Sequence, residues 1–461
     1  MSAETAETDG RAKGGRLVVV SNRVPDPGKT QAGGLAVALD AALKERGGLW
    51  FGWSGRTVET GTASDAPRSR RRGPVTYATI DLDESEHEHY YAGFANRALW
   101  PVCHFRLDLI QISAKDTRGY FAVNERFARV LAPLLEPDDI VWVHDYHLIP
   151  LAAALRAAGV RNRIGFFLHI PWPPSQVSSA LPAYQRLLSG LAAYDVVGFQ
   201  TPLDAENFQA CLARDLPEAA ARPPLARDFP IGIETAAFVA LAREAAQDEL
   251  AVRLRRSMRG RDLIIGVDRL DYSKGIGQRL EAFERYMETH AESRDAVSLL
   301  QITPRSRSEV PEYQQMEQQV AEHVGRINGA FGDVDWVPIR YVNSPIPHTS
   351  LAGLYRMAKV GLVTPLRDGM NLVAKEFVAA QPEDDPGVLI LSRFAGAVHE
   401  LDGALIVNPY DTDATAAAIA RALEMELDER TERWRRMMTR IAANTTREWA
   451  AEFIGVLEGR R

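Results

Sequence analysis

The chain has 461 residues, of which 46% are hydrophobic and 25% charged, values that are ordinary for a globular protein. At roughly 100–200 residues per domain, this length predicts two or three domains that bury their own cores without disulfides or a structural metal. The 54 Lys and Arg residues against 61 Asp and Glu residues give a formal net charge of −7, which argues against a nucleic-acid partner.

The N-terminal residues 1–15 are polar and small, and they lack the apolar core of a signal peptide, so we expect a disordered tail there. No stretch approaches the ~18 apolar residues of a membrane span. Cys103 and Cys211 do not have the spacing of a disulfide framework or a zinc site. These features favour a cytoplasmic protein without a membrane partner.

In the first half of the chain, short apolar β-rich runs alternate with helical patterns. Continuous apolar runs with polar ends are typical of parallel strands that are covered on both faces. Helical spacing of apolar residues follows Gly33-Gly34, and another helix is expected to end or kink at Pro133. The predicted strands are residues 16–21, 139–144, 163–169 and 195–200.

The second half repeats this alternation, with predicted strands at residues 262–268, 297–303, 360–364 and 387–392. Alternating strands and helices predict parallel sheets with right-handed crossovers. About ten strands are too many for one open sheet. We therefore predict an α/β fold with two Rossmann-like, doubly wound domains that face a cleft. The expected boundaries are residues 16–232 and 233–444, followed by a C-terminal helix within 445–461 that returns to the first domain.

Ligands of open parallel sheets bind beyond the carboxyl ends of the strands, so the residues that follow each strand are candidates for binding. Arg23 follows the first strand, and Gly33-Gly34 then open a helix. Glycines let the backbone approach a ligand, and the free N–H groups of a helix N-terminus attract anions. This pattern indicates an anion site, although an ordinary strand–loop–helix turn has the same appearance.

In the second domain, residues 268–275 follow the first strand and carry two cations, Arg269 and Lys274, within six positions. This spacing suits a diphosphate. The alternative is a salt-bridged loop in which Arg269 pairs with Asp271.

Residues 365–376 follow a later strand and lead into a helix whose N-terminus offers N–H groups to phosphate oxygens. Asp368 and Glu376 are placed to accept hydrogen bonds from sugar hydroxyls. The alternative is that Asn371 caps the helix and Glu376 is solvated.

Three other charged or histidine-containing segments have simpler interpretations. The run at residues 68–72, with four arginines, is expected to be a solvated loop, and His87 and His89 are expected to lie on a solvated helical surface. The histidines of 144–147 lack a third ligand, so a metal site there is disfavoured. The Gly-x-Gly-x-x-Gly fingerprint of nicotinamide cofactors follows none of the strands. The pattern alone therefore predicts phosphorylated ligands in an interdomain cleft without naming a reaction.

Nine segments together resemble the trehalose-6-phosphate synthase family, which are retaining glycosyltransferases of the two-Rossmann (GT-B) type. They run in family order from about residue 16 to about residue 410, so the resemblance covers nearly the whole chain. The segments are VVVSNR, AGGLAVAL, GLWFGWSG, ALWPVCHFRLDL, VWVHDYHLIPL, RIGFFLHIPWP, VDRLDYSKG, VGRINGAFGD and LVTPLRDGMNLVAKEFVAAQ.

The resemblance implies a pocket for the acceptor, glucose 6-phosphate. In the family, the phosphate is gripped by guanidinium groups at positions that match Arg23 and Arg307, a task that suits bidentate donors. Tyr91 is expected to share the phosphate, Asp145 to accept a sugar hydroxyl, and Trp100 to shape the pocket. Core packing is the alternative for Tyr91 and Trp100, and the adjacent Tyr90 leaves a one-residue shift of the match open.

The same resemblance implies a pocket for the donor, a nucleotide-glucose. Asp368 is expected to bind the transferred glucose and His169 to contact its outer hydroxyl, while Glu376 holds the ribose and Ile346 contacts the base. The backbone of Leu372 and Val373 is expected to bind phosphate. The positions that match the family's diphosphate contacts are Gly33, Gly34, Arg269 and Lys274.

The implied reaction is a front-face substitution in which the leaving diphosphate takes the acceptor's proton. The expected catalytic residues are Arg269, Lys274, Asp145, His169 and Asp368. No metal or other cofactor is expected, because Arg and Lys supply the positive charge, and domain closure excludes water. The alternatives are a pseudo-glycosyltransferase that joins cyclitols, a non-catalytic sensor of sugar phosphates, and a nicotinamide oxidoreductase. The sequence leaves open whether the donor carries UDP, GDP or ADP, and whether the chain forms a homo-oligomer.

Overall fold

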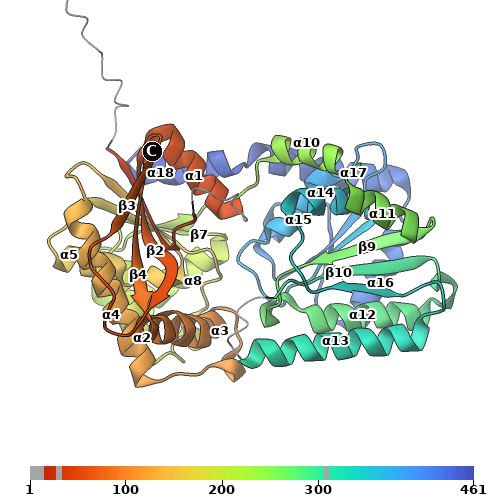
Figure 1. The fold of residues 1–461 in the computed structure, drawn as a ribbon, viewed down its shortest axis with the longest axis horizontal. Coiled ribbons are helices and arrows are strands. Elements are labelled where there is room, and N and C mark those ends of the chain that lie inside the picture. The colour runs from red at the N-terminus through yellow and green to blue at the C-terminus, as the bar shows by residue number, and fades with distance from the viewer. Residues whose placement is uncertain (1–14, 27–33, 306–310, 461) are drawn as a thin grey trace, which may run out of the picture.

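The computed structural model describes residues 15–26, 34–305 and 311–460, with two α/β halves side by side (Figure 1). Most of the predicted tail therefore lies outside the described residues. The predicted ligand contacts Gly33 and Arg307 lie outside them as well.

The N-terminal half is built on an eight-stranded sheet in the order β3-β4-β2-β1-β5-β6-β7-β8. All neighbouring strands are parallel except β3, which pairs antiparallel with β4 at the edge. The strands are β1 (Leu17–Arg23), β2 (Gly48–Val58), β3 (Arg68–Arg72), β4 (Val75–Asp83), β5 (Ile140–His144), β6 (Arg163–Phe167), β7 (Val196–Phe199) and β8 (Leu225–Asp228).

Helices cover both faces of this sheet, which explains why its central strands are apolar throughout. Along β1, Leu17 and Val19 point into one core while Val18 and Val20 point into another. The helices are α1 (Gly34–Arg46), α2 (Glu84–Glu86), a π-helix (His87–Leu99), α3 (Trp100–Cys103), α4 (Ala114–Leu131), α5 (Leu151–Ala157), α6 (Ser175–Ser178), α7 (Tyr184–Ala192), α8 (Pro202–Asp215) and α9 (Pro217–Ala220).

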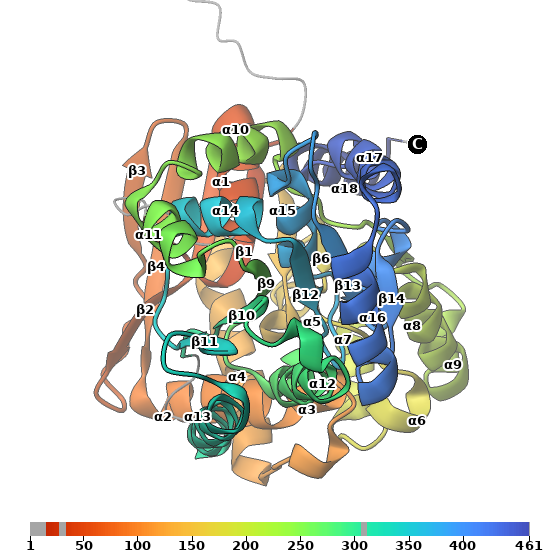
Figure 2. The same cartoon turned by 90° about the vertical axis from the view of Figure 1, so that its right-hand side faces the viewer.

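The C-terminal half has a six-stranded, fully parallel sheet in the order β11-β10-β9-β12-β13-β14. Its strands are β9 (Asp262–Val267), β10 (Val297–Ile302), β11 (Ile339–Val342), β12 (Val360–Val363), β13 (Val388–Ser392) and β14 (Leu405–Val407). Figure 2 shows this sheet with helices on both sides. The helices are α10 (Thr235–Ala245), α11 (Glu249–Met258), α12 (Ile276–Thr289), α13 (Pro311–Phe331), α14 (His348–Met357), α15 (Leu372–Ala380), α16 (Thr412–Glu424) and α17 (Leu427–Ala443).

The last helix, α18 (Thr446–Leu457), crosses back to the N-terminal half and lies beside α1 (Figure 1). Trp449 and Phe453 pack on Trp142 of β5, with ring centroids 4.9 and 4.7 Å away. A Cβ atom at Gly165 or Gly198 would lie only 2.7 or 2.8 Å from the Phe453 ring, so these strand glycines make room for it. The helix thus ties the end of the chain to the first sheet.

All eight predicted strands are present, but the prediction missed β2, β3, β4, β8, β11 and β14. The prediction of a loop at residues 68–72 was wrong, because this segment forms β3, whose side chains are all exposed. Arginines on an edge strand disfavour pairing with another chain, so a charged run is compatible with a strand there. The four-residue strand β8 lies just before the expected domain boundary at residue 232.

Candidate active site

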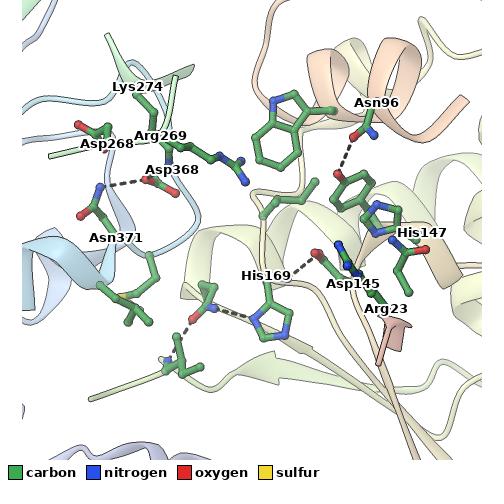
Figure 3. A pocket seen from close by; sticks show the side chains of 18 of the residues that line it. Arg23, Asn96, Asp145, His147, His169, Asp268, Arg269, Lys274, Asp368 and Asn371 are labelled. Carbon is green, nitrogen blue, oxygen red and sulfur yellow. Dashed lines mark hydrogen bonds and ion pairs between the residues drawn. The ribbon is translucent and has the colours of Figure 1, made fainter. Parts of the chain in front are cut away.

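The carboxyl ends of the two sheets face each other across a cavity of about 910 Å³ (Figure 3). Ile346, on the loop between β11 and α14, does not line this cavity, and its contact with a base stays a prediction. The contact of Gly34, at the start of α1, with the diphosphate also stays a prediction. The predicted residues that do line the cavity are Arg23, Tyr91, Trp100, Asp145, His169, Arg269, Lys274, Asp368, Leu372, Val373 and Glu376.

At the N-terminal end of the cavity, Arg23 completes β1 and its guanidinium lies 6.0 Å from the centre of the Trp53 ring. Gly55 makes this position possible, because a Cβ there would lie 2.5 Å from Nε of Arg23. Gly55 also has a φ of +81°, in the left-handed region that favours glycine. The backbone of β2 thus fits closely against the arginine.

An aromatic wall stands next to Arg23. Tyr91 stacks on His147 with centroids 5.7 Å apart and an interplanar angle of 11°. The neighbouring Tyr90 is fully buried, and its hydroxyl donates to Oδ1 of Asn22 at 2.9 Å. Tyr91, and not Tyr90, therefore faces the cavity.

The prediction of a solvated surface was wrong for His89, whereas His87 is half-buried. His87 lines the cavity, with its ring centroid 5.3 Å from that of Tyr91. His89 is mostly buried, and its Nδ1 lies 2.7 Å from Oδ1 of Asp116. The π-helix that carries both residues changes the angular spacing of side chains, which a pattern based on 3.6 residues per turn does not capture.

Asp145 follows β5 and has a φ of +75°, which is unusual for a residue other than glycine. Its N–H donates to the carbonyl of Phe167 at 2.8 Å, and its Oδ1 accepts from the N–H of His169 at 3.3 Å. Such strain is held by the surrounding structure and concentrates at functional sites. The conformation directs the carboxylate into the cavity next to His169 (Figure 3).

His169 belongs to a buried chain of hydrogen bonds. Its Nε2 lies 3.2 Å from Nδ1 of His144, and its Nδ1 lies 3.5 Å from Nε2 of Gln200. Gln200 in turn accepts from the N–H of Ile231, in the segment that joins the two halves, at 3.1 Å. Burial lowers the pKa of His169 to about 3 and the pKa of His144 well below its ordinary value. Both imidazoles are therefore neutral at pH 7.

At the C-terminal end, Lys274 and Asp368 form an ion pair with Nζ 2.5 Å from Oδ2. Nδ2 of Asn371 donates to the same oxygen at 3.0 Å. Burial acts to raise the pKa of Asp368, but the charge of Lys274 and these hydrogen bonds outweigh it, and the pKa lies below its ordinary value. Asn371 also caps α15, so the helix N-terminus is held directly at the cavity.

Arg269 combines both predicted arrangements. It pairs with Asp271 at 3.3 Å, and it also lines the cavity, where its guanidinium lies 4.7 Å from the centre of the Trp100 ring. The salt-bridged loop and the cationic site are thus the same loop.

A buried ion pair between Arg279 and Asp268 supports the loop that carries Arg269. Arg279 of α12 donates to Asp268 at 2.6 Å and to Thr364 at 3.1 Å, and its side chain is fully buried. It links the ends of β9 and β12, which carry the loops with Lys274 and Asp368.

Glu376 lines the cavity, and its side chain is only 13% exposed, so the alternative that it is solvated was wrong. Its Oε1 lies 3.1 Å from Nε2 of His348, and this hydrogen bond raises the pKa of the imidazole.

Several lining residues were not predicted. Most of them lie within the segments that resemble the family, so their position was the available signal. The exceptions are His87, Ala92, Asn96, Gln200 and Ile231, which no sequence signal separates from core residues. The missed lining residues are Asn22, Trp53, His87, Ala92, Asn96, Tyr146, His147, Ile170, Gln200, Ile231, Asp268, Met370 and Asn371.

The described residues contain neither a metal-binding cluster nor a membrane-spanning helix. No group of three or more His, Cys, Asp or Glu side chains there is arranged to hold a metal ion. None of the described helices has the length and apolar character that crossing a membrane requires.

Comparison with known proteins gives matches over nearly the full length. Residues 21–459 match the model of glycosyltransferase family 20. The trehalose-6-phosphate synthase of Sinorhizobium fredii is 55% identical over 456 residues, which cover 96% of this chain and 98% of that protein.

Solved structures agree with this match. The UDP-forming α,α-trehalose-phosphate synthase of Burkholderia vietnamiensis has a TM-score of 0.94 at 45% identity, covering 96% of this chain and 99% of that one. The Burkholderia xenovorans enzyme in complex with glucose 6-phosphate has a TM-score of 0.92 at 47% identity, covering 96% of this chain and 100% of that one. An Escherichia coli structure with bound UDP-2-fluoro-glucose has a TM-score of 0.90 at 44% identity, covering 96% of this chain and 99% of that one.

Proposed function

The chain belongs to glycosyltransferase family 20, and we propose that it transfers glucose from UDP-glucose to glucose 6-phosphate to give α,α-trehalose 6-phosphate and UDP. One observation carries the proposal. Two separate sets of cations, Arg23 on one side and Arg269 with Lys274 on the other, line a single cavity between two Rossmann-like sheets. Two phosphorylated substrates, each held at one end, fit this arrangement.

The acceptor is proposed to bind at the N-terminal end. Arg23 offers a fixed guanidinium to the 6-phosphate, and Tyr91 adds a hydroxyl beside it. Asp145 accepts a sugar hydroxyl, and Trp100 closes the pocket. A relative solved in complex with glucose 6-phosphate supports the choice of this acceptor. We also assign Arg307 to the phosphate, on the family resemblance alone.

The donor is proposed to bind at the C-terminal end. Arg269 and Lys274 hold the diphosphate, together with backbone N–H groups of Leu372 and Val373 at the start of α15. Asp368 and His169 bind hydroxyls of the transferred glucose, and Glu376 binds the ribose. A relative bound to a UDP-sugar analogue supports UDP as the nucleotide.

In the proposed mechanism, the bond between the anomeric carbon and the diphosphate oxygen breaks first, and its electron pair stays on the diphosphate. The acceptor hydroxyl attacks the oxocarbenium-like carbon from the same face, and its proton passes to that diphosphate oxygen, so configuration is retained. Arg269 and Lys274 stabilise the developing negative charge. Preorganised charges of this kind are commonly the largest catalytic contribution.

We propose that the reaction needs no metal, since Arg269 and Lys274 supply the two positive charges on the donor diphosphate. We also propose a cytoplasmic location, which the two buried, unpaired cysteines Cys103 and Cys211 support.

A direct assay tests the function. The purified protein is mixed with glucose 6-phosphate and with UDP-, GDP- or ADP-glucose in turn, and the disaccharide phosphate is measured by mass spectrometry and NMR. Formation of α,α-linked product fastest with UDP-glucose supports the proposal. Absence of product with every donor would refute it.

A further inference from the structure

A buried carboxylate joins the two ends of the cavity. The Asp271 side chain is fully buried at the start of the 3₁₀ turn Tyr272–Lys274, in the C-terminal half. Its Oδ1 accepts from Nε1 of Trp100, which comes from α3 in the N-terminal half, at 3.4 Å. Its Oδ2 accepts from Nη2 of Arg269 at 3.3 Å.

These contacts close a triangle. The guanidinium of Arg269 also lies 4.7 Å from the centre of the Trp100 ring, a distance at which the attraction between a cation and an aromatic face is effective. Each of Trp100, Asp271 and Arg269 therefore contacts the other two, and the domain boundary passes between Trp100 and the remaining pair.

Asp271 also shapes the turn that carries Lys274. Its Oδ1 accepts from the N–H of Ser273 at 3.0 Å, and its carbonyl accepts from the N–H of Lys274 at 3.0 Å. The hydroxyl of Tyr313 donates to Oδ2 at 3.2 Å. Of the two donor cations, the carboxylate therefore contacts only Arg269, whereas the turn that carries Lys274 is closed mainly by the backbone.

Further contacts beside the triangle cross the same boundary. The guanidinium of Arg106 lies 5.4 Å from the centre of the Tyr272 ring, and that of Arg367 lies 3.7 Å from the centre of the Phe105 ring. Phe105 has a φ of +60°, so the loop that follows α3 holds strain in order to reach the C-terminal half. The boundary is therefore closely packed where the triangle lies.

We propose that Asp271 is a positioning residue that couples the two substrate sites: it transmits the position of Trp100, in the acceptor pocket, to Arg269, at the donor diphosphate. This proposal rests on the function proposed above. An acceptor that packs against Trp100 favours the closed arrangement in which Asp271 holds Arg269 toward the diphosphate. Separation of the halves breaks the Trp100 contacts and leaves Arg269 less constrained.

Coupling of this kind is measurable without turnover. UDP binding is followed by calorimetry in the presence and absence of saturating glucose 6-phosphate. With the wild-type protein, glucose 6-phosphate is expected to tighten UDP binding by about 10-fold, within the range usual for coupled sites. By linkage, UDP must tighten glucose 6-phosphate binding by the same factor.

Two variants break the triangle at different points. Asp271→Asn removes the charge that holds Arg269, and Trp100→Phe keeps the aromatic face but removes the N–H donor. In both, the coupling is expected to fall below about 2-fold, while binding of UDP alone changes by less than about 3-fold. A purely structural defect would instead weaken UDP binding with and without the acceptor. If Asp271→Asn does not fold, Trp100→Phe carries the test.

The control is Asp262→Asn, which removes a carboxylate paired with Lys359 at the opposite end of β9 and should keep the coupling. Unchanged coupling in the folded triangle variants, or no coupling in a wild type that makes product, would overturn the inference. A wild type that makes no disaccharide phosphate would instead overturn the proposed function, so the two failures are distinguishable.

Discussion

Nζ of Lys274 lies 2.5 Å from Oδ2 of Asp368, although 94 residues separate them in the chain. The two loops meet because β9 and β12 are neighbours in the parallel sheet, so that their carboxyl ends lie side by side. The pair places a cation and an anion at the point where the proposed donor's diphosphate meets its glucose. One loop thereby serves the leaving group and the other the sugar.

The first prediction concerns this cation. Lys274→Ala is expected to lower kcat by roughly 10²–10³, because a preorganised charge on the leaving group is lost, and also to lower thermal stability, because the mostly buried Asp368 loses its ion-pair partner. The control is Lys359→Ala, since Lys359 forms a comparable pair with Asp262 at the opposite end of the same strands. Equal turnover in the two variants would remove the catalytic role of Lys274.

The strands that carry this pair were predictable, because their apolar runs are continuous and are bounded by polar residues. The edge strand β3 was not, since its five residues include four arginines and its pairing with β4 is visible only in the folded sheet. The turns at Arg23, Arg269 and Asp368 were predicted because they follow such strands.

The positive φ of Asp145 and the position of His87 on a π-helix were not predictable, because they arise from tertiary packing. The contact between Trp100 and Asp271 was missed for a similar reason. It joins residues 171 positions apart, in different halves of the molecule.

The second prediction concerns pH and the buried His144. The unfolded chain binds a proton at this residue below about pH 6.5, whereas burial keeps the folded imidazole neutral to a much lower pH. Acid therefore favours unfolding, and stability rises with pH until about 6.5.

Replacement of His144 by Gln should remove the contribution of this residue to the pH dependence of stability. The difference in unfolding free energy between wild type and His144→Gln is expected to shrink by at most about 1.4 kcal/mol per pH unit below 6.5. Urea titrations at pH 7.5, 6.5 and 5.5 measure it. A difference that stays constant over this range would show that folded His144 titrates normally.

The third prediction concerns the metal. Because Arg269 and Lys274 are proposed to neutralise the diphosphate, dialysis against EDTA should leave kcat within about twofold of the untreated enzyme. Removal of an essential catalytic charge would instead lower kcat by roughly 10²–10³. Restoration of activity by Mg²⁺ or Mn²⁺ after a large loss would contradict this prediction.

The last prediction uses two glycines with the same backbone conformation. Gly55 has a φ of +81° and Gly61 a φ of +79°, but a Cβ at Gly55 would meet Arg23, while nothing lies within 4 Å of one at Gly61. Both Ala variants should lose about 1 kcal/mol of stability from the left-handed backbone. Only Gly55→Ala should also displace Arg23, and we expect it to raise KM for glucose 6-phosphate by about tenfold or more, which corresponds to losing about 1.4 kcal/mol of binding. Initial rates at saturating UDP-glucose measure this KM. If both variants raise this KM, backbone strain determines acceptor affinity. If neither variant raises it, a residue other than Arg23 does.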